Sequence, residues 1–353
     1  MITDISIENF KALKELNLNG LNRISLVSGR NNVGKSTLLE ALFLYMDHLA
    51  GDSFGKLSMF RGTIAMGANG LWNPLFYQMN TQNPIIISVK DDGEFGKLKY
   101  ERDDSYLPDN ISGISESSIA HFRAENNASY SLGFTYIKGN YNEKGHFSLN
   151  NSNGVLREVT TSLPGNEAVR MKQTQFMGTR RNAGFDYLVN QLGSMELQGE
   201  KKLLINALKE MDPSIEDVLT LSVQGLTQIY IRTDGRLVPL YYAGDGIYEL
   251  VGICLAIEEQ KNGLVLIDEL ETGLHYSMYE QLWKTIDYIS ERFNCQVIAT
   301  THSYELISAV TGGLSSLQDF SYYRIGKEDN ISVAHRYDYD MLDSALKSDM
   351  EVR

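Results

Sequence analysis

The sequence of 353 residues contains only two cysteines and no long hydrophobic run. Cys254 and Cys295 lie in apolar segments without a CxxC or histidine spacing around them, which excludes a disulfide framework and a zinc site. No apolar stretch approaches the roughly 18 residues of a membrane span. The first ten residues lack a basic stretch followed by an apolar block, so no signal peptide is visible. We expect a globular, cytoplasmic protein without a membrane partner.

Positive charge is also scarce, because the formal net charge is -13. A protein that wraps nucleic acid by electrostatics alone needs clustered lysine and arginine, so this function class is disfavoured. The average leaves room for a local contact with DNA. The densest basic group consists of Arg170, Lys172, Arg180 and Arg181, and such a group is most often a solvated face.

The front of the chain predicts a strand, a glycine loop and a helix in succession. Residues 1–8 and 22–28 have the apolar pattern of strands, and residues 36–49 have apolar residues at helical spacing. Residues 84–162 then change to short β-rich runs separated by turn dipeptides, which predicts an antiparallel meander. Residues 185–210 are again helical in pattern.

The last third predicts a second α/β block. After a hairpin over residues 227–242, helical patterns at 247–260 and 278–293 alternate with the fully apolar runs 264–267 and 296–299. Such runs, separated by helices, indicate a parallel sheet covered on both faces.

A glycine-rich stretch between the second strand and the first helix matches G-x-x-x-x-G-K-[ST] at every fixed position. Its glycines let the backbone curl so that N–H groups and the helix N-terminus face phosphates. In such a loop Lys35 reaches the β- and γ-phosphates and the Ser36 hydroxyl binds Mg²⁺, so we expect ATP and Mg²⁺ as cofactors. The predicted phosphate-binding residues are Gly29, Asn31, Asn32, Val33, Gly34, Lys35, Ser36 and Thr37.

Two adjacent carboxylates, Asp268 and Glu269, follow the apolar run 264–267. Open α/β sheets bind ligands beyond the carboxyl ends of their strands. Asp268 is therefore predicted to hold Mg²⁺ through water, as a Walker-B aspartate does. Consecutive strand-end residues face different directions, so Glu269 is predicted to orient or deprotonate the attacking water.

His302 ends the next apolar run, within Ala299-Thr300-Thr301-His302-Ser303. A neutral imidazole there can hydrogen-bond a γ-phosphate or the attacking water. A strand-end histidine alone more often has a structural role. Its position after the carboxylate pair makes His302 the second candidate catalytic residue.

In this order the motifs resemble the ABC-type ATPase heads of the group that includes RecF, the structural-maintenance-of-chromosomes (SMC) heads and the overcoming-lysogenisation-defect (OLD) nucleases. The resemblance covers roughly residues 1–46 and 237–353. Besides the glycine loop, it rests on an Asn-Phe-Lys segment, the carboxylate pair followed by a Leu-His pair, and the Thr-His-Ser segment. The residues are Asn9, Phe10, Lys11, Asp268, Glu269, Leu274, His275, Thr301, His302 and Ser303.

This resemblance implies an α/β fold: an ABC-type P-loop ATPase head with a mixed, mainly parallel core sheet, an antiparallel β-meander and an inserted helical subdomain. Residues 1–80 would form the N-terminal half of the ATPase domain and residues 237–353 its C-terminal half. Residues 81–236 would hold the inserted meander and helical subdomain.

The resemblance also implies site residues. Asn9, Phe10 and Lys11 would border the nucleotide, and Gln78 would contact Mg²⁺ and water, unless it is a surface glutamine. The Ser-x-Gly signature of such heads is replaced by Tyr242-Ala243-Gly244-Asp245-Gly246. Without the serine hydroxyl, backbone N–H groups of Gly244, Asp245 and Gly246 would have to meet the partner subunit's ATP.

The implied function is an ATP-hydrolysing switch that forms a homodimer or higher homo-oligomer through ATP-sandwiched heads. It would regulate a separate effector, a nuclease or toxin, in anti-phage defence.

One alternative is a RecF-like DNA repair ATPase, against which the acidic net charge weighs. A self-contained OLD-type nuclease is the other. Asp338-Tyr339-Asp340 has the spacing of its Toprim domain, but too few residues follow and no suitable strand precedes. We expect that this chain alone does not cut DNA.

Overall fold

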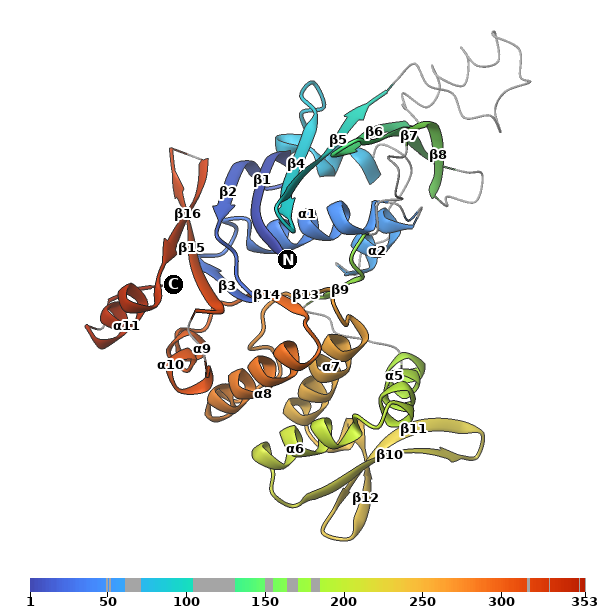
Figure 1. Ribbon diagram of the computed structural model, residues 1–353, viewed down its shortest axis with the longest axis vertical. Coiled ribbons are helices and arrows are strands. Elements are labelled where there is room, and N and C mark those ends of the chain that lie inside the picture. Colours follow the sequence, from blue (N-terminus) through green and yellow to red (C-terminus); the bar gives the residue numbers. More distant parts are fainter. Residues whose placement is uncertain are drawn as a thin grey trace. The chain divides into compact units, whose positions relative to one another are not determined.

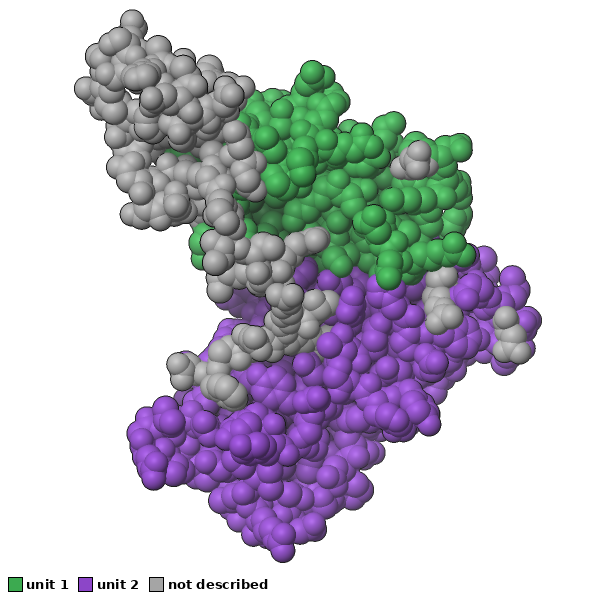
Figure 2. Space-filling view, turned by 180° about the vertical axis from the view of Figure 1, so that it is seen from behind, with its two compact units in different colours: residues 1–21, 29–171, 325–336 green, residues 22–28, 172–324, 337–353 purple. Residues whose placement is uncertain are grey.

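A computed structural model gives the fold for residues 1–48, 50, 52–60, 71–103, 131–149, 155–163, 171–178, 185–315, 318–329, 331–348 and 350–352. The chain divides into two compact units, which Figure 2 shows in different colours. Unit 1 comprises Met1–Leu21, Gly29–Met171 and Ile325–Arg336. Unit 2 comprises Asn22–Ser28, Lys172–Arg324 and Tyr337–Arg353. Each unit is therefore built from separate stretches of sequence.

Unit 1 contains a seven-stranded antiparallel sheet in the order β2-β1-β4-β5-β6-β7-β8 (Figure 1). Side chains of β4 alternate between buried and half-buried, because successive strand residues point to opposite faces. The meander predicted over residues 84–162 is confirmed for the described residues, with 104–130 and 150–154 lying outside them, and β1 and β2 extend it. The strands are β1 (Ile2–Phe10), β2 (Leu13–Asn19), β4 (Ile85–Asp91), β5 (Glu94–Arg102), β6 (Ser131–Lys138), β7 (Tyr141–Leu149) and β8 (Val155–Leu163).

The helices of unit 1 include the one predicted after the glycine loop, α1 (Lys35–Asp47). Every residue of α1 from Thr37 to Met46 is buried, and the helix contacts β1 and β4. A helix that is apolar on nearly all sides belongs in a core rather than on a surface. The other helical elements are α2 (Ser53–Phe60) and the short 3₁₀ helices η1 (Asn73–Leu75) and η2 (Tyr77–Met79).

Most of a six-stranded sheet, ordered β16-β15-β3-β14-β13-β9, belongs to unit 2. Neighbouring strands among β3, β14, β13 and β9 are parallel. All residues of β3, β13 and β14 are buried, which accounts for the apolar runs within them. The strands are β3 (Ile24–Gly29), β9 (Thr174–Met177), β13 (Leu264–Ile267), β14 (Gln296–Thr300), β15 (Phe320–Glu328) and β16 (Ile331–Tyr337).

Helices of unit 2 pack on this sheet and on one another, with α7 against β13 and α8 against α7 (Figure 1). The predicted helical stretch 185–210 forms two helices, because Gly199 has a positive φ of 74° and follows the end of the first one. The helices are α5 (Phe185–Leu197), α6 (Lys201–Met211), α7 (Asp245–Glu259), α8 (Tyr279–Arg292), α9 (Tyr304–Ser308), α10 (Val310–Gly313) and α11 (Tyr339–Lys347), with the 3₁₀ helices η4 (Leu240–Tyr242) and η5 (Tyr276–Met278).

A small antiparallel sheet of β10 (Ile215–Val223), β11 (Leu226–Thr233) and β12 (Arg236–Pro239) contacts α5 and α6. The predicted hairpin about Asp234-Gly235 is confirmed, but its second strand ends at Pro239, and residues 240–242 form the 3₁₀ helix η4 instead of strand. Asp338, the first carboxylate of the Asp-x-Asp segment, caps α11 by accepting a hydrogen bond from the Met341 N–H at 2.8 Å. Within the described residues, no helix is both long and apolar enough to cross a membrane.

The division predicted at residues 80 and 236 stays a prediction. Strands from both sides of residue 80 pair in the sheet of unit 1, since β1 pairs with β4. Of the basic group named above, only Lys172 lies among the described residues.

A largely buried ion pair joins the residue before β3 to α8 inside unit 2. The Arg23 guanidinium donates to Asp287 Oδ1 at 2.6 Å, and the Ser315 N–H donates to Asp287 Oδ2 at 2.8 Å. Burial alone would raise the pKa of Asp287, but the hydrogen bonds from Ser315 and the charge of Arg23 lower it below its ordinary value. Asp287 thus ties three segments of unit 2 together.

We expect Asp287→Ala to lower the free energy of unfolding by about 3–5 kcal/mol, because it removes the carboxylate that Arg23 and Ser315 both bind and leaves the largely buried Arg23 with only the longer contact to the exposed Asp319. Because folding lowers the pKa of Asp287, its contribution is present above the unfolded pKa of about 3.9 and is lost as pH falls through the folded pKa. Denaturant unfolding at pH 7 and at lower pH measures both effects. The control is Asp319→Ala, whose carboxylate is 49% exposed and 3.4 Å from Arg23, and which should cost less than about 1 kcal/mol. Equal losses in the two variants would contradict this account.

Candidate active site

The loop predicted to bind phosphate joins β3, which ends at Gly29, to α1, which begins at Lys35. Three of its residues have positive φ: Gly29 at 143°, Asn32 at 61° and Gly34 at 108°. No side chain caps the N-terminus of α1. A curled loop ahead of a helix without a side-chain cap is the arrangement in which backbone N–H groups bind an anion.

Two glycines of the loop are required by their neighbours in unit 1. A Cβ on Gly34 would lie 2.3 Å from Leu13 Cδ2, and one on Gly29 would lie 2.3 Å from the carbonyl oxygen of Ile325. The loop is also held by β16, because the Ser332 hydroxyl donates to the carbonyl oxygen of Val33 at 2.9 Å. The glycines of the motif therefore serve packing as well as backbone conformation.

The Lys35 side chain lies over the loop that precedes it and is buried. Its ammonium group donates to the carbonyl oxygens of Gly29 at 2.7 Å and Arg30 at 3.1 Å. The charge is thus held at the start of α1, on the loop that is predicted to receive the phosphates.

The Asn-Phe-Lys segment at the end of β1 contacts α1 through the Lys11 side chain. The Lys11 ammonium lies 2.9 Å from Glu40 Oε2 on α1 and 5.4 Å from the centre of the Phe10 ring, which is fully buried. The Asn9 amide donates to the carbonyl oxygen of Asn83 at 2.5 Å. Lys11 and Phe10 are therefore placed against α1 and the core, whereas Asn9 faces the start of β4.

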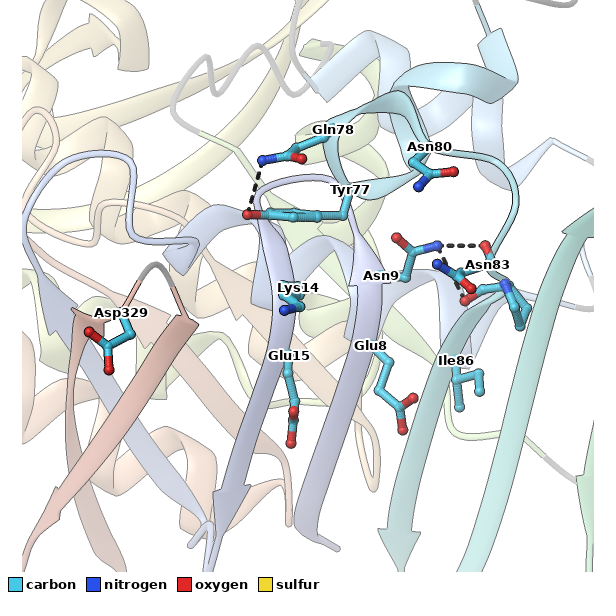
Figure 3. Close-up of a pocket in the computed structure, with 11 residues that line it drawn as sticks. Glu8, Asn9, Lys14, Glu15, Tyr77, Gln78, Asn80, Asn83, Ile86 and Asp329 are labelled. Atoms are coloured by element: carbon cyan, nitrogen blue, oxygen red, sulfur yellow. Dashed lines mark hydrogen bonds between the residues drawn. The ribbon is translucent and has the colours of Figure 1, made fainter.

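A pocket of about 700 Å³ in unit 1 brings Asn9 and Gln78 together (Figure 3). Gln78 is exposed, has a φ of 52° and donates its amide to the Tyr77 hydroxyl at 3.4 Å. In Figure 3, Tyr77 and Gln78 lie on one side of the pocket and Asn9 points to Asn83 on another. The pocket is lined by Glu8, Asn9, Lys14, Glu15, Tyr77, Gln78, Asn80, Asn83, Pro84, Ile86 and Asp329.

The predicted carboxylates stand at the end of β13 in unit 2. Asp268 is 7% exposed, and its Oδ1 accepts a hydrogen bond from the Thr300 hydroxyl at 2.6 Å. Glu269 has a positive φ of 50°, and its N–H donates to the same hydroxyl at 2.9 Å. The sequence argument assigned no role to Thr300, although a hydroxyl at the end of a buried apolar strand is a signal that could have found it.

His302 follows β14 and is joined to the segment after the carboxylates. Its N–H donates to Glu271 Oε1 at 2.6 Å, and the side chain is half-buried. The structure thus brings Asp268, Glu269 and His302 to the ends of the neighbouring strands β13 and β14. Glu271, to which the sequence argument assigned no role, fixes the backbone of His302.

The segment in place of the Ser-x-Gly signature forms the start of α7. Gly244 has a φ of 100°, and Asp245 is the first residue of the helix. A Cβ on Gly246 would lie 2.7 Å from Met278 Cε, and one on Gly273 would lie 2.9 Å from Glu249 Cγ. The segment after the carboxylates therefore packs closely on the first turn of α7.

Residues 24–308 match the family model described as "AAA domain, putative AbiEii toxin, Type IV TA system". The chain belongs to this family. An ATP/GTP phosphatase of Helicobacter pylori is 26% identical over 333 residues, which are 87% of this chain and 86% of that protein.

Solved structures of Smc heads share the fold of this AAA-domain chain. The SmcHead bound to the C-winged helix domain of ScpA gives a TM-score of 0.53 at 10% identity, covering 98% of this chain and 99% of that one. The Smc head domain with an extended coiled coil, bound to the C-terminal domain of ScpA derived from Pyrococcus furiosus, gives 0.50 at 9% identity and 98% coverage of both chains. The predicted resemblance in fold to SMC heads is confirmed.

The residues of this AAA-domain protein fit a nucleotide with Mg²⁺. The loop offers an N-terminus without a side-chain cap and the Lys35 charge, which suit phosphates. The hydroxyl of Ser36 and the carboxylate of Asp268 are hard oxygen donors, which Mg²⁺ prefers. Asp245 fits less well, because a carboxylate in the first turn of α7 occupies the helix end that would attract a second phosphate.

We expect Gly34→Ala to weaken ATP binding by at least about 10-fold, because an L-residue at this φ costs about 1–2 kcal/mol and its Cβ also meets Leu13. Calorimetric titration with ATP measures the loss. Gly55→Ala is the matched control, since Gly55 is exposed inside α2 with no atom within 4 Å of the added Cβ. That variant should gain about 0.5–1 kcal/mol of stability and keep its affinity. Wild-type affinity in Gly34→Ala would exclude the loop as the phosphate site.

Proposed function

We propose that this chain is an ATP-hydrolysing switch that dimerises head to head and regulates a separate effector protein. The observation that carries the proposal is the common edge of the parallel strands. β3 leads directly into the phosphate-binding loop, and the neighbouring strands β14 and β13 end at Thr300 and at the pair Asp268 and Glu269. The H. pylori relative, named an ATP/GTP phosphatase, supports hydrolysis of a nucleoside triphosphate.

In this proposal the glycine loop binds the phosphates, and residues at the ends of β13 and β14 act on the attacking water. The N–H groups of the first turn of α1 and the Lys35 ammonium hold the β- and γ-phosphates. Glu269 orients or deprotonates the attacking water, and His302 hydrogen-bonds the γ-phosphate or that water. Mg²⁺, when bound by Ser36, Asp268 and Gln78, would neutralise charge on the phosphate oxygens.

The surface around the start of α7 supports a partner-facing role. Tyr242, two residues before Gly244, is 71% exposed, and Tyr276 is 65% exposed on the segment that packs on α7. Exposed aromatic side chains are enriched at protein interfaces. In a head-to-head dimer the N–H groups of Gly244, Asp245 and Gly246 would approach the partner's ATP.

The effector is proposed on the family and on the fold. The family description names a putative AbiEii toxin and a type IV TA system, which supports a link between this chain and a toxin. That the effector is a toxin or nuclease acting in anti-phage defence is part of the proposal. The SmcHead structure is bound to a domain of another protein, ScpA, so a head of this fold can carry a separate partner.

We expect Glu269→Gln to retain ATP binding and to lower kcat by about 10²- to 10⁴-fold, because the amide keeps the shape of the carboxylate and loses the base. Phosphate release with ATP and with GTP measures the rate, and titration measures the affinity. Lys35→Ala should lose binding itself, and Glu291→Gln, an exposed glutamate on α8, should behave as wild type. A wild-type rate in Glu269→Gln would transfer the role of base to another residue, with His302 the next candidate.

We expect the mass of Glu269→Gln in solution to double with ATP and Mg²⁺ and to remain that of one chain with ADP. Light scattering after gel filtration measures the mass, and Lys35→Ala should remain a single chain throughout. A single chain that has ATP bound would rule out the proposed dimer.

Pull-downs of a co-purifying protein with ATP, with ADP and without nucleotide test the switch, and equal capture in all three would contradict it.

A further inference from the structure

Thr300, the last residue of β14, binds three consecutive residues of the neighbouring strand end. Its hydroxyl donates to Asp268 Oδ1 at 2.6 Å and accepts from the Glu269 N–H at 2.9 Å. Its carbonyl oxygen accepts from the Leu270 N–H at 2.9 Å. Thr300 is fully buried, so water does not compete for these hydrogen bonds.

The backbone at Glu269 needs such support. A φ of 50° at a residue with a side chain is a left-handed conformation, which costs about 1–3 kcal/mol and persists only where the surroundings impose it. The residues on both sides are fixed, because the Asp268 N–H donates to the Met177 carbonyl oxygen at 2.8 Å and the Leu270 N–H is bound to Thr300. The Thr300 hydroxyl adds the hydrogen bond at Glu269 itself.

The same hydroxyl also sets the orientation of the Asp268 carboxylate. A hydrogen bond from a neutral hydroxyl to a charged carboxylate is stronger than one between neutral groups and fixes the rotation of the carboxylate. One atom therefore links the residue predicted to hold the metal to the backbone of the residue predicted to act on water. The neighbouring Thr301 is equally buried, but its hydroxyl accepts from the Ser303 N–H at 2.9 Å.

We propose that Thr300 is the positioning residue of the Asp268–Glu269 pair. Its hydroxyl holds the Asp268 carboxylate in the orientation that receives Mg²⁺ and stabilises the left-handed turn that presents Glu269 to the attacking water. The proposal rests on the ATPase function proposed above and extends it to a side chain that does not touch substrate.

The test compares Thr300→Val, which keeps the shape and removes the hydroxyl, with Thr300→Ser, which keeps the hydroxyl. Thr285→Val is the matched control: Thr285 is also buried in unit 2, and its hydroxyl has no hydrogen-bond partner among the described residues. Thermal unfolding of all three establishes that each variant is folded before it is compared.

The first readout is hydrolysis as a function of Mg²⁺ concentration. In Thr300→Val we expect the Mg²⁺ concentration for half-maximal rate to rise, or kcat to fall, by about 10- to 100-fold, as for other residues that orient a metal ligand. Thr300→Ser and Thr285→Val should match the wild type.

The second readout needs no nucleotide and no metal. Amide hydrogen exchange, followed residue by residue by NMR, should be faster at Glu269 in Thr300→Val than in the wild type, because that N–H loses its acceptor. The Leu270 amide is an internal control, since its acceptor is the Thr300 carbonyl oxygen, which every variant retains.

Wild-type Mg²⁺ dependence and wild-type exchange at Glu269 in Thr300→Val would overturn the proposal while leaving the ATPase function intact. If Thr300→Val does not fold, Thr300→Ser decides: a rate reduced 10-fold or more there would overturn it, and a wild-type rate would support it. A wild-type protein that hydrolyses neither ATP nor GTP would instead refute the proposed function. The exchange at Glu269 would then still decide whether the hydroxyl holds the turn.

Discussion

The register of three parallel strands determines where the chemistry of this protein is placed. In β3, β14 and β13, Val27 lies opposite Thr300, and Ile267 lies opposite Ala299. Parallel strands end at the same edge of a sheet, so the residue before the glycine loop, the Thr300 hydroxyl and the Asp268 carboxylate all emerge there. A shift of one residue would turn every side chain of a strand to the other face. Because these strands are completely buried, the same packing that stabilises unit 2 also fixes the positions of the carboxylates.

Backbone conformation accounts for as much of the candidate site as side-chain identity does. Gly29 and Gly34 have positive φ, and each is placed against another part of unit 1 where a Cβ has no room. Glu269 has positive φ without being glycine, which is the mark of a residue held by its surroundings. In this structure the motif residues therefore define the site largely through the backbone conformations that they adopt.

The start of α7 differs from the heads that the chain resembles. The serine hydroxyl of the signature is missing, and a carboxylate, Asp245, lies in the first turn of the helix, where it interacts favourably with the helix dipole of its own chain. Close contacts of Gly246 with Met278 and of Gly273 with Glu249 join this helix start to the segment after the carboxylates. Any movement of one of these two segments would therefore be transmitted to the other by direct packing.

The sequence by itself determined the features that depend on neighbours along the chain. The fixed spacing of the glycine loop, the helical period after it and the apolar run before Asp268 predicted β3, α1 and β13, because a loop, a helix and a buried strand each have a local pattern. The pairing of β1 with β4, the contact of Leu13 with Gly34 and the hydrogen bonds of Thr300 were decided only by the tertiary structure. Each of these joins residues that are far apart in sequence, and their partners are selected by packing and strand register, which no local pattern encodes.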